Sequence, residues 1–282
     1  MNHRSRPRSR TLRKRTGATV VAAAITASIP AAAQAAVACN ETALVQAIND
    51  ANAAGGANVV LTPGCTYNLI QSHASGPNGA TGLPIITTVI TLTGNQNVIN
   101  RSAAVPFRIA EVANTGKLTL KSVTLNNGSA VGSGGGILNF GAVTLTGSAL
   151  TNNSATGTGG GLSNADVPTE TGTAATFTSS TVSGNSATGN GGGVYNGLRG
   201  TLAMSSSFVK TNVSSARGGG IAAMDSTATS LTSTPVSDNN ASLGAGGIYR
   251  SGGVMTMTTS PITGNSTNNC VGSSPEVPDC TA

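Results

Sequence analysis

The chain of 282 residues contains no tryptophan, and aromatic residues make up only 2% of it. Charged residues are also scarce, at 9%. It has no cluster of cysteines and histidines, which removes the usual basis for a zinc or other transition-metal site. We therefore expect no metal site and no cofactor. No segment after the N-terminal region is apolar and long enough to form a membrane-spanning helix.

The positive charge is confined to one end of the chain. The formal net charge is +6, but seven of the fifteen lysines and arginines precede residue 16. Residues 36–282 hold eight basic and nine acidic residues, which gives a net charge of −1. A nucleic-acid-binding protein carries its basic residues on the folded domain. The sequence therefore predicts no nucleic-acid partner.

Residues 1–35 have the three parts of a secretory signal peptide. A basic stretch is followed by the apolar run "GATVVAAAITASIPAAA" and by the small residues "AQA" that end at Ala35. This apolar run is too short, and too poor in large side chains, for a comfortable membrane span. We expect a secreted, extracellular or cell-surface protein whose mature chain has no transmembrane segment.

A repeat runs through the second half of the chain. In each copy a large apolar residue is followed five positions later by an aliphatic residue and eight positions later by asparagine. The three series are Leu145, Phe177, Met204, Leu231 and Met257; Leu150, Val182, Val209, Val236 and Ile262; and Asn153, Asn185, Asn212, Asn239 and Asn265. Glycine-rich stretches beginning at Gly134, Gly159, Gly191, Gly218 and Ala245 keep the same phase. A period in the twenties with short alternating strands predicts a solenoid.

The glycines and asparagines fit the corners of such coils. Glycine permits positive φ and close approach between coils, and stacked asparagines can form a hydrogen-bonded ladder. Upstream, "NETALVQAINDANAAGG" places Leu44, Val45, Ile48 and Ala51 on one helical face, with Gly55 and Gly56 as a stop. We expect one β-helix domain over residues 36–282, with a helical cap (36–58), coils (59–269) and a C-terminal plug (270–282).

Four cysteines, Cys39, Cys65, Cys270 and Cys280, remain after residue 35. An even number in an exported chain indicates disulfides, and three pairings are possible. A rod-shaped chain keeps its two ends apart. The pairing we favour is therefore Cys39–Cys65 with Cys270–Cys280.

The opening helix, the segment "VVLTPGCTYNL" and the repeats resemble known families. The opening looks like the N-terminal cap of pectate-lyase-like right-handed parallel β-helices. The "GGGI" stretches and the aliphatic-x-x-Asn pattern resemble the repeats of polymorphic outer membrane proteins. The resemblance, which covers residues 39–269, implies an all-β, right-handed parallel β-helix solenoid with a short N-terminal α-helical cap. The resemblance indicates the fold but says little about the activity, because the repeats only build the coils.

Enzymes of the families this chain resembles act on acidic polysaccharides, and the lyases among them hold calcium with clustered carboxylates. Here the corners after the glycine-rich strands carry charge of alternating sign, as a ladder of surface ion pairs would. The functional alternative is a groove that binds a sugar or another polar ligand. Two tyrosines are expected to point outward nearby. The candidate ligand-binding residues are Asp166, Glu170, Arg199, Asp225, Arg250, Tyr195 and Tyr249, of which Asp166, Glu170, Asp225 and Arg199 are also the weak catalytic candidates. His73 is expected to be a loop residue, not a catalyst.

A second array consists of the hydroxyl residues that flank each inward apolar residue. The pairs are Thr144/Thr146, Thr176/Thr178, Ala203/Ser205, Ser230/Thr232 and Thr256/Thr258. They resemble the Thr-x-Thr faces of ice-binding β-solenoids, although β propensity alone also places threonine on exposed strands.

The sequence favours a binding, adhesive or structural module that recognises glycans or cell-surface partners. The alternative is a polysaccharide lyase or glycoside hydrolase, which would need calcium only if it is a lyase. An ice-binding solenoid is the third possibility. The sequence leaves open the ligand, the oligomeric state and any attachment to the cell.

Overall fold

The computed structural model describes residues 1, 3, 35–164 and 172–280. The chain divides into Met1–Ala33 and Gln34–Ala282, and all the described helices and strands belong to the second unit. The expected signal peptide lies almost wholly outside the described residues, as do Asp166 and Glu170.

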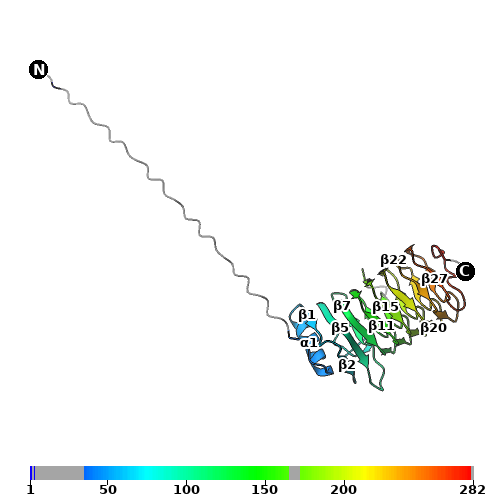
Figure 1. Ribbon diagram of the computed structural model, residues 1–282, viewed down its shortest axis with the longest axis horizontal. Helices are drawn as coiled ribbons and strands as arrows, with labels where there is room; N and C mark the ends of the chain where they lie inside the picture. Colours follow the sequence, from blue (N-terminus) through cyan, green and yellow to red (C-terminus); the bar gives the residue numbers. More distant parts are fainter. Residues whose placement is uncertain (2, 4–34, 165–171, 281–282) are drawn as a thin grey trace. The chain divides into compact units, whose positions relative to one another are not determined.

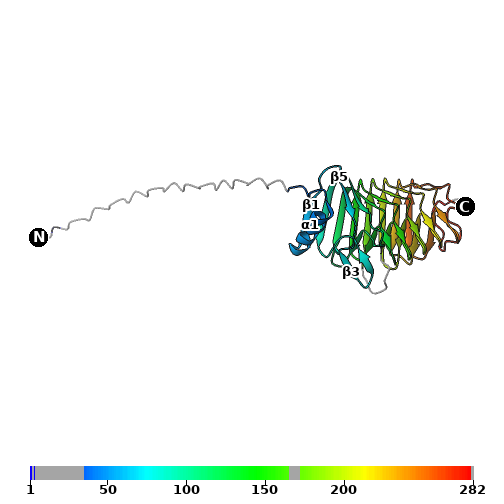
Figure 2. The ribbon, with the colours of Figure 1, turned by 90° about the horizontal axis from the view of Figure 1, so that it is seen from below.

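Residues of the second unit form a stack of coils, with helix α1 (Glu41–Ala53) at one end (Figures 1 and 2). Each coil contributes strands that pair in parallel with the equivalent strands of the coils before and after it. Among the described strands, only the hairpin of β3 (Ala74–Gly76) and β4 (Gly79–Thr81) is antiparallel. The expected all-β parallel solenoid with a short N-terminal helix is confirmed.

The largest sheet bends at a corner into two faces, because β5 and β7 each run through both. The long face consists of β1 (Gly56–Val60), the starts of β5 (Val89–Arg101) and β7 (Lys117–Asn126), β10 (Ala142–Thr146), β14 (Ala174–Thr178), β18 (Thr201–Ser205), β22 (Ala228–Thr232) and β26 (Val254–Thr258). The second face consists of β2 (Thr66–Leu69), the ends of β5 and β7, β11 (Ala149–Thr151), β15 (Thr181–Ser183), β19 (Phe208–Lys210), β23 (Val236–Ser237) and β27 (Ile262–Thr263).

Two smaller sheets close each coil. The short sheet consists of β8 (Ser129–Ala130), β12 (Ser154–Ala155), β16 (Ser186–Ala187), β20 (Val213–Ser214) and β24 (Asn240–Ala241). The third face consists of β6 (Ala110–Val112), β9 (Ile137–Asn139), β13 (Leu162–Asn164), β17 (Val194–Asn196), β21 (Ile221–Met224) and β25 (Ile248–Ser251).

The core is a continuous column of the predicted apolar residues. Leu145 of β10 is in register with Phe177 of β14, and Leu150 of β11 with Val182 of β15. All four side chains are buried. At the C-terminal end Met257 is only partly buried, because no further coil covers it. The predicted inward register is confirmed.

The asparagines form the predicted ladder, and it is buried. The side-chain amide of Asn185 donates to the side-chain oxygen of Asn212 at 2.9 Å, and Asn212 donates in the same way to Asn239 at 2.9 Å. The second amide hydrogen of Asn212 reaches the carbonyl of Val182 at 3.0 Å. The backbone N–H of Asn185 also donates to the Asn212 side-chain oxygen, at 3.0 Å. Each amide therefore satisfies its polar atoms through neighbouring coils.

The glycine-rich stretches perform both expected tasks. Gly191 has φ +72°, a conformation that side-chain-bearing residues rarely adopt. A Cβ at Gly192 would lie 2.3 Å from the carbonyl oxygen of Val213 in the next coil. The glycine at this second position is needed because the coils approach too closely for a side chain.

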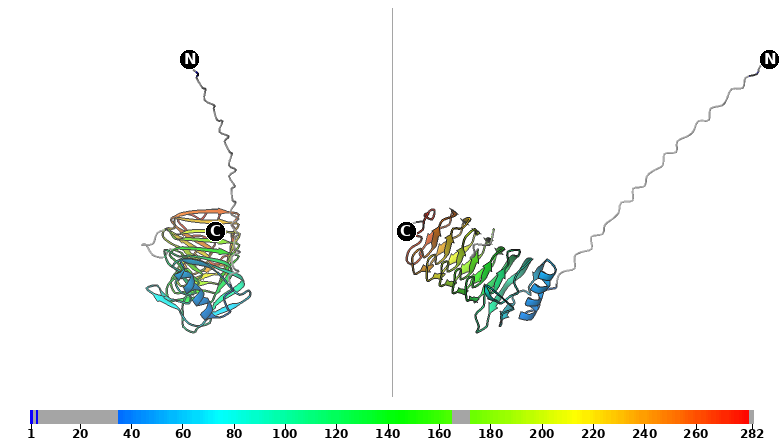
Figure 3. Two further views of the ribbon diagram at one scale, coloured as in Figure 1. Left: turned by 90° about the vertical axis from the view of Figure 1, so that its left-hand side faces the viewer. Right: turned by 180° about the vertical axis from the view of Figure 1, so that it is seen from behind.

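The N-terminal end is closed by α1, which lies across the end of the stack (Figure 3). Its N-cap residue Asn40 accepts from the Ala43 backbone N–H at 2.9 Å. Leu44, Ile48 and Ala51 are buried against the first coil, whereas Val45, which was assigned to the same face, is only half-buried. The Cys39–Cys65 disulfide joins the segment before the helix to the first coil, as predicted.

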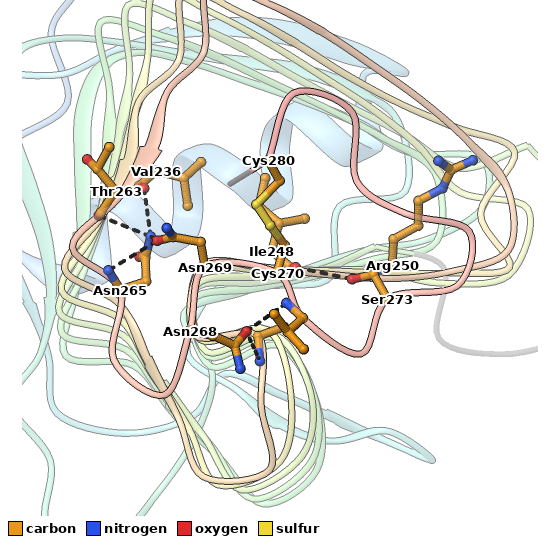
Figure 4. Close-up of a disulfide and its surroundings, with 12 residues drawn as sticks. Val236, Ile248, Arg250, Thr263, Asn265, Asn268, Asn269, Cys270, Ser273 and Cys280 are labelled. Atoms are coloured by element: carbon orange, nitrogen blue, oxygen red, sulfur yellow. Dashed lines mark hydrogen bonds between the residues drawn. A yellow bond between two sulfur atoms is a disulfide. The ribbon is translucent and has the colours of Figure 1, made fainter. Parts of the chain in front are cut away.

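The C-terminal end is closed by the predicted Cys270–Cys280 disulfide, which lies beside Ile248 of the last coils (Figure 4). The asparagine ladder also ends here. Asn265 donates its side-chain amide to the side-chain oxygen of Asn269 at 3.0 Å (Figure 4). Asn269 thus takes the place that an asparagine of a further coil would occupy.

Replacing Asn212 with alanine tests the ladder. The change removes the acceptor of both the side-chain amide and the backbone N–H of Asn185. It also removes the side-chain donor to the Val182 carbonyl and one of the two donors to the Asn239 side-chain oxygen. We expect a loss of roughly 2–4 kcal/mol in the free energy of unfolding, measured by denaturant titration. The control is Asn240→Ala, an exposed asparagine on the neighbouring coil, which should change stability by less than about 0.5 kcal/mol. Equal losses in the two variants would contradict a structural role for the ladder.

Candidate binding surfaces

Arg199 and Asp225 occupy equivalent corners of successive coils, directly after the strands of the third face. Both have positive φ, 63° and 49°, and both side chains are exposed. The Arg199 backbone N–H donates to the Asp225 carbonyl at 3.4 Å. The structure therefore brings these two predicted residues together, while their predicted neighbours Asp166 and Glu170 lie outside the described residues.

Arg250 does not continue this column. It lies on β25 in register with Ala223 of β21, not with Asp225. Its guanidinium donates to the carbonyl of Gly252 at 3.3 Å and to that of Glu276 at 2.9 Å. The bond to Glu276 fastens the C-terminal segment to β25, the last strand of the third face. Arg250 differs from Arg199 and Asp225 because β25 is the last strand of the third face, where the side chain reaches a backbone carbonyl of the C-terminal segment.

The two candidate tyrosines share one column, as expected. Tyr195 of β17 and Tyr249 of β25 are both in register with Ala222 of β21, which separates them. Tyr249 is only 8% exposed because Arg217 lies 5.0 Å from its ring centroid and donates to its hydroxyl at 3.1 Å. Tyr195 is half-buried. In this structure the Tyr249 ring is therefore covered by a cation.

The predicted hydroxyl array lies on the outer side of the long face. Strand register places it in two columns, Thr144–Thr176–Ala203–Ser230–Thr256 and Thr146–Thr178–Ser205–Thr232–Thr258. A third column beside them holds Ala142, Ala174, Thr201, Ala228 and Val254. From β10 to β26 this surface carries only small uncharged side chains. Lys117 and Lys121 of β7 mark its end toward the N-terminus.

The third face carries a buried ion pair that the sequence patterns did not predict. Arg108 is 1% exposed and Glu111 is 5% exposed, and the Arg108 Nη1 lies 3.1 Å from the Glu111 Oε2. Thr81 and Asn78 of the β3–β4 hairpin also bond to this pair. A signal was present, since "FRIAEV" places two charges inside an otherwise apolar segment. The pair holds the hairpin to the first strand of the third face.

Burial lowers the pKa of the Arg108 guanidinium, and the Glu111 carboxylate opposes this by raising it. Four of the five guanidinium N–H groups have acceptors, namely the Thr81 hydroxyl, the Glu111 carboxylate and the carbonyls of Asn78 and Ser133. The Nε atom is buried without a partner. Such a group stays protonated in proteins and must be neutralised where it is buried.

His73 forms part of the cap. Its Nε2 lies 2.7 Å from the Glu41 Oε1, which also accepts from the backbone N–H of Ile70 at 3.1 Å. Glu41 is the first residue of α1, so this contact ties the helix to the segment after β2. The interpretation of His73 as a loop residue fits this position.

Removing one partner of the buried pair should destabilise the protein strongly. Glu111→Ala would leave the Arg108 charge buried without its carboxylate, so we expect a loss of roughly 3–5 kcal/mol in the free energy of unfolding. The double variant Arg108→Met with Glu111→Leu should recover most of that loss, because it removes both charges. Thermal and urea unfolding of the three proteins measures this. A single variant as stable as the parent would mean that the guanidinium is hydrated.

Within residues 35–164 and 172–280, no group of three or more histidine, cysteine, aspartate or glutamate side chains is placed to hold a metal ion. None of the described helices is long and apolar enough to cross a membrane. Comparison with models of known families, with curated proteins and with solved structures found no match to this chain. The parallel solenoid is therefore shown by its own strand pairing, and the resemblance to pectate-lyase-like proteins stays a prediction.

Proposed function

We propose that this protein is an exported binding module that attaches to an uncharged, extended glycan through the outer side of its long face. The observation that carries the proposal is the composition of that surface. Across β10, β14, β18, β22 and β26 all fifteen outward side chains are alanine, serine, threonine or valine. A surface without charge disfavours the acidic polysaccharides on which the resembled enzymes act.

The chemistry of this surface suits sugars. Serine and threonine hydroxyls both donate and accept hydrogen bonds, as sugar hydroxyls do. The methyl groups of alanine, threonine and valine supply apolar contact for the C–H faces of a sugar ring. None of the fifteen outward side chains is aromatic, so a sugar ring has no aromatic ring to stack on here and affinity would come from many weak contacts along the face.

The spacing of the surface suits a repeating ligand. Neighbouring strands lie about 4.8 Å apart, and outward residues recur about every 6.6 Å along a strand. The parallel register keeps equivalent hydroxyls in line over five coils. A polymer chain lying along the stack would therefore meet the same groups at a constant interval. The proposal also includes that the chain is a pectate-lyase-like β-helix, that residues 1–35 direct its export and that it acts outside the cell.

The same two columns favour a second candidate, an ice-binding surface. A flat array of threonine methyl and hydroxyl groups at regular spacing can order water as well as contact a sugar. The array is interrupted by Ala203, and Ser205 and Ser230 lack the methyl group of threonine. These three departures reduce the regularity that a lattice of ordered water requires. They matter less for a glycan, which needs only some of the hydroxyls.

The experiment compares binding to cellulose, chitin and xylan with inhibition of ice recrystallisation. We expect the parent protein to be retained by at least one neutral polysaccharide and Thr176→Lys to bind it at least about tenfold more weakly. The reason is that a long charged side chain would stand in the middle of the flat face.

The matched control is Thr181→Lys, which alters the second face of the same coil. It should bind as the parent does. Ice activity that Thr176→Lys abolishes, without polysaccharide binding, would replace the glycan proposal with the second candidate. Undiminished polysaccharide binding by Thr176→Lys would exclude the long face as the binding surface.

A further inference from the structure

The second face carries a strip of three apolar rings on its outer side, toward the C-terminal end of the stack. Phe208 of β19 is 51% exposed, although the chain has only four phenylalanines and the other three are buried. Strand pairing places Pro235 level with Phe208 in the next coil and Pro261 level with Pro235 in the last one. Pro235 is half-buried and Pro261 is exposed. The strip Phe208–Pro235–Pro261 is thus an apolar surface open to contact.

The fold does not require these rings. In the preceding coils the residue at this position donates a backbone hydrogen bond to the coil before it. The Thr181 N–H donates to the Ser148 carbonyl at 3.0 Å, and the Phe208 N–H donates to the Ser180 carbonyl at 2.9 Å. Proline has no N–H, so the last two coils go without this bond. An exposed aromatic ring gains its burial only from another molecule, and such rings are enriched at protein interfaces.

One cation and one anion lie beside the strip. Lys210 follows Phe208 by two residues and points to the same outer side of β19, and Asp238 directly follows β23 in the next coil. Both side chains are exposed. Within the described residues, neither the Lys210 ammonium nor the Asp238 carboxylate has an ion-pair partner. The second face therefore offers an apolar strip and two opposite charges that are not yet paired.

A two-fold rotation makes this face complementary to itself. The axis lies between β19 and β23 and runs parallel to them, so β19 of one copy lies over β23 of the other. Phe208 then contacts the partner's Pro235. Lys210 lies over the partner's Ser237, one residue, about 3.3 Å, from the partner's Asp238. Every contact occurs twice, as in the isologous interface of a symmetric dimer.

We infer that the second face is a dimerisation surface and that its partner is a second copy of this chain. Charge complementarity selects the copy, because an acidic partner would oppose Asp238 and a basic one would oppose Lys210. The strands from β11 to β27 on this face have only two or three residues each. The contact is therefore small, and we expect a Kd of about 1–100 µM. The long face lies beyond a corner, so the inference does not depend on the proposed glycan binding.

The test measures self-association of the full protein by analytical ultracentrifugation, without any glycan. Between about 1 and 500 µM the parent should show a monomer–dimer equilibrium. Phe208→Ser should weaken dimerisation at least about tenfold, because it removes the central aromatic contact. The control is Val89→Ser, since Val89 is 56% exposed but lies on the long face. It should dimerise as the parent does.

Charge reversal identifies the partner as a second copy. Lys210→Asp places a like charge opposite the partner's Asp238, and Asp238→Lys does the same opposite the partner's Lys210. Each variant alone should dimerise at least about tenfold more weakly. An equimolar mixture of the two should form a heterodimer as tight as the parent dimer, because each introduced charge then meets its opposite. Lys117→Asp, on the long face, is the charge control and should leave dimerisation unchanged.

The mixture separates contact between chains from repulsion within one chain. Mixing cannot relieve repulsion between positions 210 and 238 of the same molecule, so recovery in the mixture requires that they meet across the interface. Circular dichroism should show all the variants folded. Three results would overturn the inference: a parent that stays monomeric over the whole range, equal dimerisation by Phe208→Ser, or no heterodimer in the mixture.

Discussion

The structure depends on one buried interaction, the asparagine ladder at the corner between the second face and the short sheet. A buried amide is costly unless all its polar atoms are bonded. Asn212 meets this requirement only through Asn185, Asn239 and the backbone of an adjacent coil. Each coil must therefore place its asparagine at the same height and corner as its neighbours. The ladder fixes the register of the stack, and the apolar column follows that register.

Because buried contacts set the register of the strands, the outward-facing residues can vary without changing the fold. The long face needs only β propensity to remain a strand, so its fifteen outward positions can all be small and uncharged. Charge is instead placed at corners such as Arg199 and Asp225, or at the cap, where His73 contacts Glu41. The buried Arg108–Glu111 pair lies where the β3–β4 hairpin departs from the regular repeat. The candidate sites are thus found where the repeat permits variation or is interrupted.

The repeat predicted most of the fold because each coil contains the same pattern of inward apolar residues, corner glycines and a buried asparagine. The spacing from Leu145 and Leu150 to Asn153 predicts which side chains point inward. Because the coils stack in parallel register, the equivalent residues of every coil point the same way. A second asparagine ladder was also visible in principle. Asn139 bonds to Asn164 and Asn164 to Asn196, each at 2.7 Å, and these three follow the glycine-rich stretches at a constant spacing. The repeat defined above contains only one asparagine per coil, so it did not predict this ladder.

By itself, the sequence determined the solenoid, its inward register, the helical cap and the hydroxyl columns, because these depend on local periodicity and on contacts between equivalent residues. Only the tertiary structure decided which residues outside the repeat meet. Arg108 and Glu111 are joined by a hairpin from residues 74–81, and Arg217 covers Tyr249 from a different coil. Arg250 turned to the C-terminal segment because the stack ends there. Such contacts depend on the path of non-repeating segments, and no periodicity encodes that path.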